Sequence, residues 1–312
     1  MLNNNEKNKI TSNGMKVMKF GGTSVAHASN INKVIDIITE ALKKQEKIVV
    51  VVSAFSGITD DLILLANLAS KKNRSYQTVF KGICGRHDQA IRELIGPENE
   101  KKGLLEIRKK YDELEKITEN IFSTQELSLA TLDAVMSFGE QLSSYVISEA
   151  IKNRGIPCKF VDSREIIKTD DNFGSANVDL DKSYKLIADR LNTAALSVMG
   201  GFIASTKDGF TTTLSRGGSD YTASLVGAAL DADVIEIWTD VDGIMTEDPR
   251  KIKNALLIPE ITYKKAEEMA YNGAKVIHPK TIRPAVLKNI PIYVKNTFNP
   301  SGSGTRISNG KK

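Results

Sequence analysis

A short glycine-rich loop near the N-terminus has the residue types that hold a phosphate. Lys19 ends a β-type run, Gly21 and Gly22 follow, and hydroxyl side chains that include Ser24 lead into a helical pattern. Glycines let backbone N–H groups approach an anion, a helix N-terminus supplies positive potential, and the lysine adds a full charge. Because the spacing matches neither the P-loop nor the Gly-x-Gly-x-x-Gly pattern, an ordinary strand-to-helix turn explains this loop equally well.

A second glycine-rich loop precedes a helix later in the chain. Arg216 lies before the pair Gly217 and Gly218, and Ser219 and Asp220 fall in the first helical turn. Helix capping would explain Ser219 and dipole complementation would explain Asp220, but neither explains the arginine or the glycines. Two glycine-rich helix starts in one chain therefore favour a polyphosphate held between them.

Two other loops carry charged side chains after a strand or a helix pattern. Thr239 and Asp240 end a strand pattern and lead toward Arg250, and acids and an arginine in such a loop suit the base, ribose and phosphates of a nucleotide. Turn chemistry alone would explain the aspartate, glycine and proline between them. Lys275 follows a predicted helix, where a lysine often only complements the helix dipole.

Short β-type runs alternate with helical periodicity around these loops. Such alternation predicts an α/β fold, a three-layer αβα sandwich in which helices cover both faces of a mainly parallel sheet. In such sheets ligands bind where strands end and helices begin, which is where these loops lie. We predict strands over residues 15–20, 48–52, 159–162, 196–204, 234–238 and 291–295, and helices over residues 31–42, 219–230 and 263–272.

Residues 74–122 interrupt this alternation. Leucine and isoleucine recur between lysines and glutamates there, which predicts amphipathic helices inserted into the α/β unit. A solvated helical face explains the charges, and a partner-binding surface is the alternative.

Composition excludes several classes of protein. Lys plus Arg is 43 and Asp plus Glu is 38, so the net charge of +5 is small, and its spread along the chain does not indicate a nucleic-acid surface. The two cysteines and three distant histidines form neither a disulfide framework nor a zinc motif. The strongly apolar run over residues 48–52 is too short for a membrane helix, and no secretory signal is present. We therefore expect a cytoplasmic protein with no nucleic-acid and no membrane partner.

In combination, the motifs resemble those of the aspartate kinases, a branch of the amino acid kinase family. The resemblance covers about residues 15–307, nearly the whole chain, and seven blocks occur in the family's order. These blocks are residues 19–24, 52–59, 138–140, 212–221, 238–243, 248–250 and 273–279. The resemblance implies one catalytic domain over residues 15–307, with a mainly aspartate-binding N-terminal part and a mainly ATP-binding C-terminal part. We expect residues 1–14 to be a disordered leader and residues 308–312 to be a flexible tail.

The implied reaction moves the γ-phosphoryl group of ATP to the side-chain carboxylate of L-aspartate. The product is 4-phospho-L-aspartate, the first step toward lysine, threonine and methionine. Because that carboxylate is already ionised at neutral pH, no general base is required. Mg²⁺ should arrive with ATP, since no residues form an all-protein metal site.

The resemblance also implies roles for the residues of these loops. Lys19 would stabilise the transferring phosphoryl group, and Asp220 would hold the lysine and organise the metal–phosphate cluster. Arg216 would clamp a carboxylate of aspartate and Glu140 would hold its ammonium group, although the residues alone equally allow Glu140 to be a helix-dipole partner. Thr59 and Ser219 would add hydroxyl contacts to the aspartate. The expected nucleotide contacts are Lys19, Gly21, Gly22, Ser24, Thr239, Asp240, Met245, Arg250, Lys275 and Val276.

The chain departs from the family in two respects. Met245 stands where many relatives carry a tyrosine, which predicts altered nucleotide affinity rather than lost activity. Many relatives also continue into regulatory ACT domains or homoserine dehydrogenase, and we expect no C-terminal ACT domain here. A homodimer is an expectation from the family alone.

The alternatives to an active aspartate kinase are another kinase of the same fold, an inactive catalytic fragment, or a protein that senses aspartate or a nucleotide.

Overall fold

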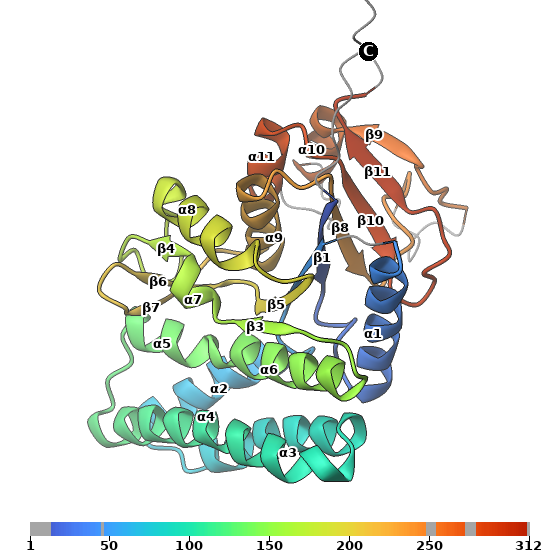
Figure 1. Cartoon of the computed structure of the whole chain (residues 1–312). Coiled ribbons are helices and arrows are strands. Elements are labelled where there is room, and N and C mark those ends of the chain that lie inside the picture. The colour runs from blue at the N-terminus through green and yellow to red at the C-terminus, as the bar shows by residue number, and fades with distance from the viewer. Residues whose placement is uncertain (1–13, 45–46, 248–253, 272–278, 311–312) are drawn as a thin grey trace, which may run out of the picture.

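The computed structural model describes residues 14–44, 47–247, 254–271 and 279–310 (Figure 1). Its main sheet has eight strands in the order β3-β5-β2-β1-β8-β10-β11-β9, and every neighbouring pair is parallel except β10 with β11. The strands are β1 (Met15–Phe20), β2 (Lys47–Val52), β3 (Lys159–Val161), β5 (Leu196–Gly200), β8 (Val234–Thr239), β9 (Glu260–Thr262), β10 (Ile292–Asn296) and β11 (Thr305–Ser308).

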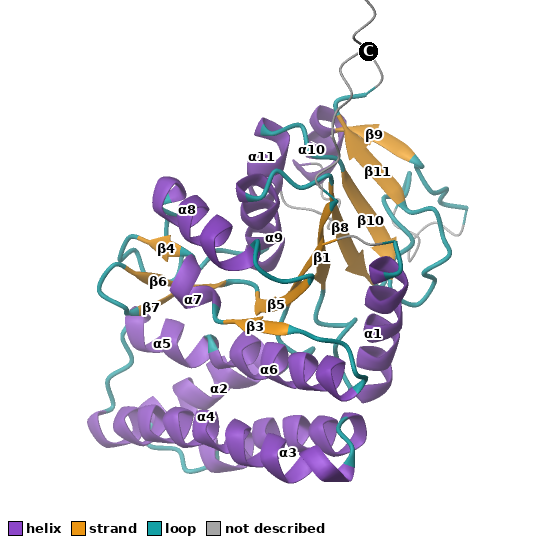
Figure 2. Ribbon diagram, in the orientation of Figure 1, coloured by secondary structure: helices purple, strands orange, loops and turns teal. Residues whose placement is uncertain are grey.

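Helices cover both faces of this sheet, so the predicted three-layer architecture is confirmed (Figure 2). The helices are α1 (Ala28–Leu42), α2 (Ile58–Ser70), α3 (Tyr76–Leu94), α4 (Pro97–Thr124), α5 (Leu129–Met136), α6 (Phe138–Asn153), α7 (Ser163–Ile166), α8 (Leu180–Leu191), α9 (Gly218–Ala229), α10 (Tyr263–Tyr271) and α11 (Pro279–Leu287). Residues of α1 and α6 belong to one buried core and residues of α8, α9 and α11 to the other. None of the helices in the described ranges is both long enough and apolar enough to cross a membrane.

Strand β1 shows how the sequence divides these two cores. Met18 and Phe20 point into the core beneath α1, whereas Met15 and Val17 point into the core beneath α9. Alternate side chains of a strand face opposite sides of a sheet, so a strand that is apolar on both faces is buried on both. By the same alternation, Lys19 faces the side on which α9 lies.

The amphipathic helices predicted over residues 74–122 are present as α3 and α4. Ile83 and Ile91 of α3 and Ile107 and Leu114 of α4 are fully buried, while the charged residues between them mostly face outward. Both helices pack with α2 below α6 in Figure 1, on the side of α6 that faces away from the sheet. They therefore enlarge the buried core that contains residues of α1 and α6.

The strand predicted over residues 196–204 is wrong in its length. Leu196–Gly200 lies in the main sheet, but Ile203–Thr206 is β6 of a second sheet, with β4 (Lys168–Thr169) and β7 (Thr211–Thr213). The chain turns between them at Gly201 and Phe202, and Phe202 has a left-handed φ of 63°. The pair Gly200 and Gly201 marks this turn in the sequence, but the apolar residues on both sides of it predict one continuous strand, because hydrophobic pattern alone does not distinguish one buried strand from two.

Residues at both ends of the predicted domain contact the main sheet. β1 begins at Met15, as predicted, and the carbonyl of the preceding Gly14 accepts a hydrogen bond from the N–H of Lys47. Ser308 pairs with Thr262 in the main sheet, so it belongs to β11 rather than to a tail. The rest of the expected leader, over residues 1–13, lies outside the described residues.

Candidate active site

The two residues predicted to be catalytic form an ion pair. Lys19 ends the central strand β1, and Asp220 lies in the first turn of α9, which packs on β1. The Lys19 Nζ atom is 2.7 Å from the Asp220 Oδ1 atom, and the two side chains are only 11% and 14% exposed. The structure therefore fixes a positive charge where the first glycine loop meets the second.

The first glycine loop is pressed tightly against its neighbours. A Cβ atom on Gly22 would lie 3.0 Å from the Ala54 carbonyl oxygen, so a side chain there would force the loop outward. Gly21 donates its N–H to the Trp238 carbonyl at 3.0 Å, which leaves that N–H engaged within the protein. The N–H of Gly22 has no acceptor among the described residues, so of the two it is the one free to meet an anion.

Ser24, which is predicted to contact the nucleotide, has its hydroxyl engaged within the protein. Its side chain is fully buried, its hydroxyl is 2.8 Å from the Thr297 hydroxyl, and it also reaches the Trp238 carbonyl at 3.4 Å. The hydroxyl therefore joins the first glycine loop to β8 and to the segment that follows β10.

A cavity of about 330 Å³ opens beside the Lys19–Asp220 pair. It lies between the ends of β1 and β2, the start of α2, the first turn of α6 and the second glycine loop. All four residues predicted to bind the substrate line it, although they are far apart in sequence. Its lining includes Lys19, Gly22, Ser53, Thr59, Glu140, Arg216, Ser219 and Asp220.

Glu140 brings a buried carboxyl group to the wall of this cavity. Burial raises the pKa of Glu140 from 4.5 to about 8, while backbone N–H groups of Ala54 and Glu140 and the charge of Lys19 act to lower that pKa. The Oε2 atom has no hydrogen-bond partner among the described residues. A buried, unpaired carboxylate is unfavourable in free energy, so this oxygen is expected to bind either a cationic group of a ligand or a proton.

Arg216 supplies the opposite charge at the rim of the same cavity. Its side chain is exposed, and its guanidinium forms no ion pair with any carboxylate in the part of the chain that the structure describes. Ser219 is held nearby by a hydrogen bond from the Ser53 hydroxyl at 3.1 Å, and Thr59 is half-buried at the start of α2. A carboxyl group at one wall and a guanidinium at the rim suit a small molecule that carries both an ammonium group and a carboxylate.

Only part of the predicted nucleotide set can be placed. Thr239 is the last residue of β8 and Asp240 follows it. The Thr239 hydroxyl donates to the Asp240 carboxylate at 3.2 Å, and the Asp240 side chain is exposed. Met245 is half-buried and pairs with Leu257 in an isolated antiparallel bridge. None of these three lines the 330 Å³ cavity. The predicted contacts Arg250, Lys275 and Val276 lie outside the described residues.

Sequence reasoning missed Asp133, a fully buried aspartate of α5. Its carboxylate accepts hydrogen bonds from the Thr213 N–H at 3.0 Å, the Thr213 hydroxyl at 2.6 Å and the Gly174 N–H at 2.9 Å. Thr213 ends β7 and lies three residues before Arg216, so Asp133 anchors the start of the second glycine loop. No local motif reveals this role, because the bonded residues are 80 and 41 positions away.

No group of three His, Cys, Asp or Glu side chains within the described ranges is arranged to hold a metal ion. Asp220 is the carboxylate that the structure places beside the Lys19 ammonium group.

The raised pKa of Glu140 predicts a pH-dependent cost in stability. The folded protein keeps a proton on Glu140 that the unfolded chain releases, so the free energy of unfolding should fall as pH rises from 4.5 to 8. Glu140→Gln removes this titration, and its loss of stability between pH 6 and pH 9 should be smaller by about 1–3 kcal/mol. Urea unfolding at both pH values measures the difference. Glu149→Gln, on the same helix, serves as the control, and a Glu140→Gln variant with wild-type pH dependence would contradict the assignment.

Comparison with known proteins places the chain in a family. The model of the amino acid kinase family matches residues 14–296. Lysine-sensitive aspartokinase 3 of Escherichia coli (strain K12) is 39% identical over 307 residues, which cover 94% of this chain and 64% of that protein. Bifunctional aspartokinase/homoserine dehydrogenase 2, chloroplastic, of Arabidopsis thaliana is 34% identical over 299 residues, covering 93% of this chain and 32% of that protein.

The chain thus spans about a third of the length of its bifunctional relatives. Among solved structures, E. coli aspartokinase III in complex with aspartate and ADP is similar, with a TM-score of 0.86 and 36% identity over 96% of this chain and 65% of that one. The match of the family model extends from β1 to β10 and includes both glycine loops, and the chain therefore belongs to the amino acid kinase family.

Proposed function

We propose that this chain is the catalytic domain of an aspartate kinase, which transfers the γ-phosphoryl group of ATP to the side-chain carboxylate of L-aspartate. The observation that carries the proposal is the cavity in which the Lys19–Asp220 pair lies beside the unpaired oxygen of Glu140 and the free guanidinium of Arg216. The similarity to aspartokinases over more than nine-tenths of the chain supports it.

In this proposal the cavity recognises aspartate by its charges. The Glu140 carboxylate receives the α-ammonium group, which compensates the buried charge and lowers the pKa of Glu140 when the substrate binds. Arg216 receives a carboxylate through two parallel N–H bonds, a geometry that a lysine does not reproduce. The Thr59 and Ser219 hydroxyls complete the polar wall. A volume of about 330 Å³ matches a small ligand.

The chemistry then rests on positioning and on charge. The attacking carboxylate is ionised at neutral pH, so the side chains only need to align it with the γ-phosphorus. Lys19 stabilises the charge that spreads over the transferring group. Gly22, whose N–H has no acceptor among the described residues, lines the same cavity. Bound with ATP, Mg²⁺ would neutralise phosphate charge, and Asp220 is the residue that would help hold it. Thr239, Asp240, Met245, Arg250, Lys275 and Val276 are proposed nucleotide contacts.

A homodimer, a cytoplasmic location and a place on the route to lysine, threonine and methionine are further proposals that rest on the family resemblance. None of them enters the test of the reaction.

The reaction is tested by incubating the full chain with Mg-ATP and L-aspartate and trapping the acyl phosphate as its hydroxamate. L-Glutamate and N-acetylglutamate serve as acceptor controls for the related kinases. Of the three acids, we expect only aspartate to give the hydroxamate product. A folded protein that binds ATP but phosphorylates no acid would contradict the proposal and indicate an inactive fragment or a sensor.

Lys19→Ala should lower kcat by about 10²–10⁴-fold, because the charge partner of the transferring group is lost. Steady-state kinetics and a thermal unfolding curve together distinguish lost catalysis from lost folding. Lys47→Ala, an exposed lysine of the adjacent strand β2, should leave both unchanged. Near-normal turnover in Lys19→Ala would exclude the assigned role.

Arg216→Lys should raise the KM for aspartate about tenfold and leave the KM for ATP nearly unchanged, since only bidentate carboxylate binding is lost. The two KM values are obtained by varying each substrate at saturation of the other. An effect confined to ATP would show that Arg216 binds the nucleotide instead.

Asp133→Asn should raise the KM for aspartate several-fold, because an amide oxygen cannot accept all three hydrogen bonds and the loop that carries Arg216 loosens. Asp170→Asn is the matched control. Asp170 is exposed and bonds Asn172 and Asn177, in the segment that holds Gly174, without touching β7. Equal KM values in the two variants would place the effect in that segment rather than in β7.

A further inference from the structure

The turn between β2 and α2, residues 53–57, connects several parts of the candidate active site. The N–H of Ala54 bonds the Glu140 carboxyl group, and the Ser53 hydroxyl donates to the Ser219 hydroxyl at 3.1 Å. We refer to this segment as the β2–α2 turn. Because it contacts both walls of the cavity, its position affects how a substrate would lie there.

The loop that follows Lys19, residues 21–27, packs directly on the β2–α2 turn. A Cβ atom on Gly22 would lie only 3.0 Å from the Ala54 carbonyl oxygen. Each segment therefore limits the position of the other, and the spacing between them is the spacing between Lys19 and the wall that carries Glu140.

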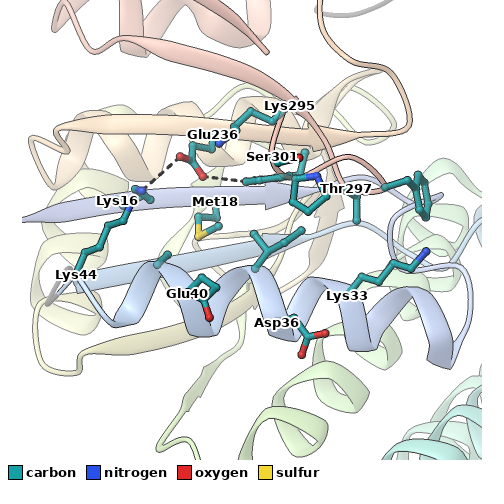
Figure 3. A pocket seen from close by; sticks show the side chains of 15 residues that line it. Lys16, Met18, Lys33, Asp36, Glu40, Lys44, Glu236, Lys295, Thr297 and Ser301 are labelled. Carbon is teal, nitrogen blue, oxygen red and sulfur yellow. Dashed lines mark hydrogen bonds and ion pairs between the residues drawn. The ribbon is translucent and has the colours of Figure 1, made fainter. Parts of the chain in front are cut away.

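Strand β8 holds the start of this loop. The Trp238 carbonyl accepts the N–H of Gly21 at 3.0 Å, and the Trp238 indole N–H donates to the Glu236 carboxylate at 3.0 Å. Glu236 in turn lies 3.3 Å from the Lys16 ammonium group, as Figure 3 shows. The far end of the loop, at Ala26, is held by a different element.

Arg86 of α3 bonds both segments at once. Its Nη1 atom donates to the Ser56 carbonyl at 2.8 Å, and its Nη2 atom donates to the Ala26 carbonyl at 3.2 Å. Within the described part of the chain the guanidinium forms no ion pair, and its hydrogen bonds go to these two carbonyls. A planar guanidinium carries donors on separate nitrogens, so it can join two acceptors at a fixed spacing.

The next residue of α3 packs against the same turn. The His87 ring is fully buried and stacks on the Phe55 ring, with the ring centres 4.5 Å apart and an angle of 12° between the planes. The His87 Nδ1 atom donates to the Ile83 carbonyl at 2.8 Å, and burial lowers the pKa of His87 from 6.5 to about 4, so the ring is neutral at pH 7. Two consecutive residues of α3 therefore contact the β2–α2 turn.

The bond to Ser56 also affects the start of α2. The Ser56 carbonyl belongs to the peptide that leads into Gly57, which has a left-handed φ of 83° and precedes α2. Thr59, two residues further on, lines the cavity. Arg86 itself is not among the lining residues, so it acts on the cavity through the segments that it holds.

We propose that Arg86 is a positioning residue for phosphoryl transfer, because its guanidinium sets the spacing between residues 21–27 and the β2–α2 turn. This inference rests on the proposed function, in which the first segment follows Lys19 and the second helps to hold the aspartate. Helix α3 lies in the segment that interrupts the α/β alternation, so that segment supports the active site as well as enlarging a core.

Hydrogen–deuterium exchange of the full chain without substrates tests the contact itself. In Arg86→Ala, peptides that cover residues 22–27 and 53–59 should exchange severalfold faster, because both segments lose a bond that limits local opening. Arg92→Ala is the matched control, since Arg92 lies on the same helix and pairs with Glu100 of α4 at 3.6 Å. Unchanged exchange of both peptides in Arg86→Ala, or the same increase in Arg92→Ala, would overturn the proposal.

Steady-state kinetics in the hydroxamate assay test the effect on the reaction. Arg86→Ala should lower kcat about tenfold or more, because the reactants are less well aligned, and should change each KM by less than about threefold, because the side chains that bind them remain. Guanidinium ion at millimolar concentration should restore part of this kcat and leave Arg92→Ala unchanged, whereas a loss of folded protein would not respond to it.

A wild-type kcat in Arg86→Ala, or a loss that guanidinium does not restore, would also overturn the proposal. If the unsubstituted chain has no turnover, the proposed function fails instead. The exchange experiment needs no turnover and still decides whether Arg86 holds the two segments together.

Discussion

The ion pair between Lys19 and Asp220 is the interaction around which the cavity is organised. Both charges are largely shielded from water, where a single charge would be unfavourable and a pair is tolerated. The pair joins the end of the central strand to the first turn of α9, so the lysine is held in place before any ligand binds. A charge that is fixed in advance stabilises a transferring phosphoryl group without the cost of reorganisation.

Close packing of backbone around this pair determines which side chains reach the cavity. A Cβ atom on Gly200 would lie 2.9 Å from the Glu140 Cβ atom, and one on Gly201 would lie 2.6 Å from the Ser219 Cβ atom. The turn between the two sheets therefore passes directly behind both residues and holds them against the cavity. The same turn separates β5 from β6.

The two faces of the sheet are linked where β1 and β8 lie side by side. Their side chains alternate, so Lys19 serves the cavity on one face while Met18 and Trp238 are buried in the core beneath α1 on the other. The backbone is common to both faces, and the Trp238 carbonyl holds Gly21. Packing beneath α1 therefore supports the loop that follows Lys19.

Apolar periodicity and glycine placement act locally along the chain, so the parallel sheet, most of its strands and the two glycine loops are predictable from the amino-acid sequence. The family motifs also identified the residues that line the cavity. The folded chain alone shows that residues 196–204 divide between two sheets and that the Ser24 hydroxyl is buried. It also shows that Asp133 anchors the loop of Arg216. These features depend on contacts between residues that lie far apart in the chain, and no local pattern records which distant group a buried side chain will meet.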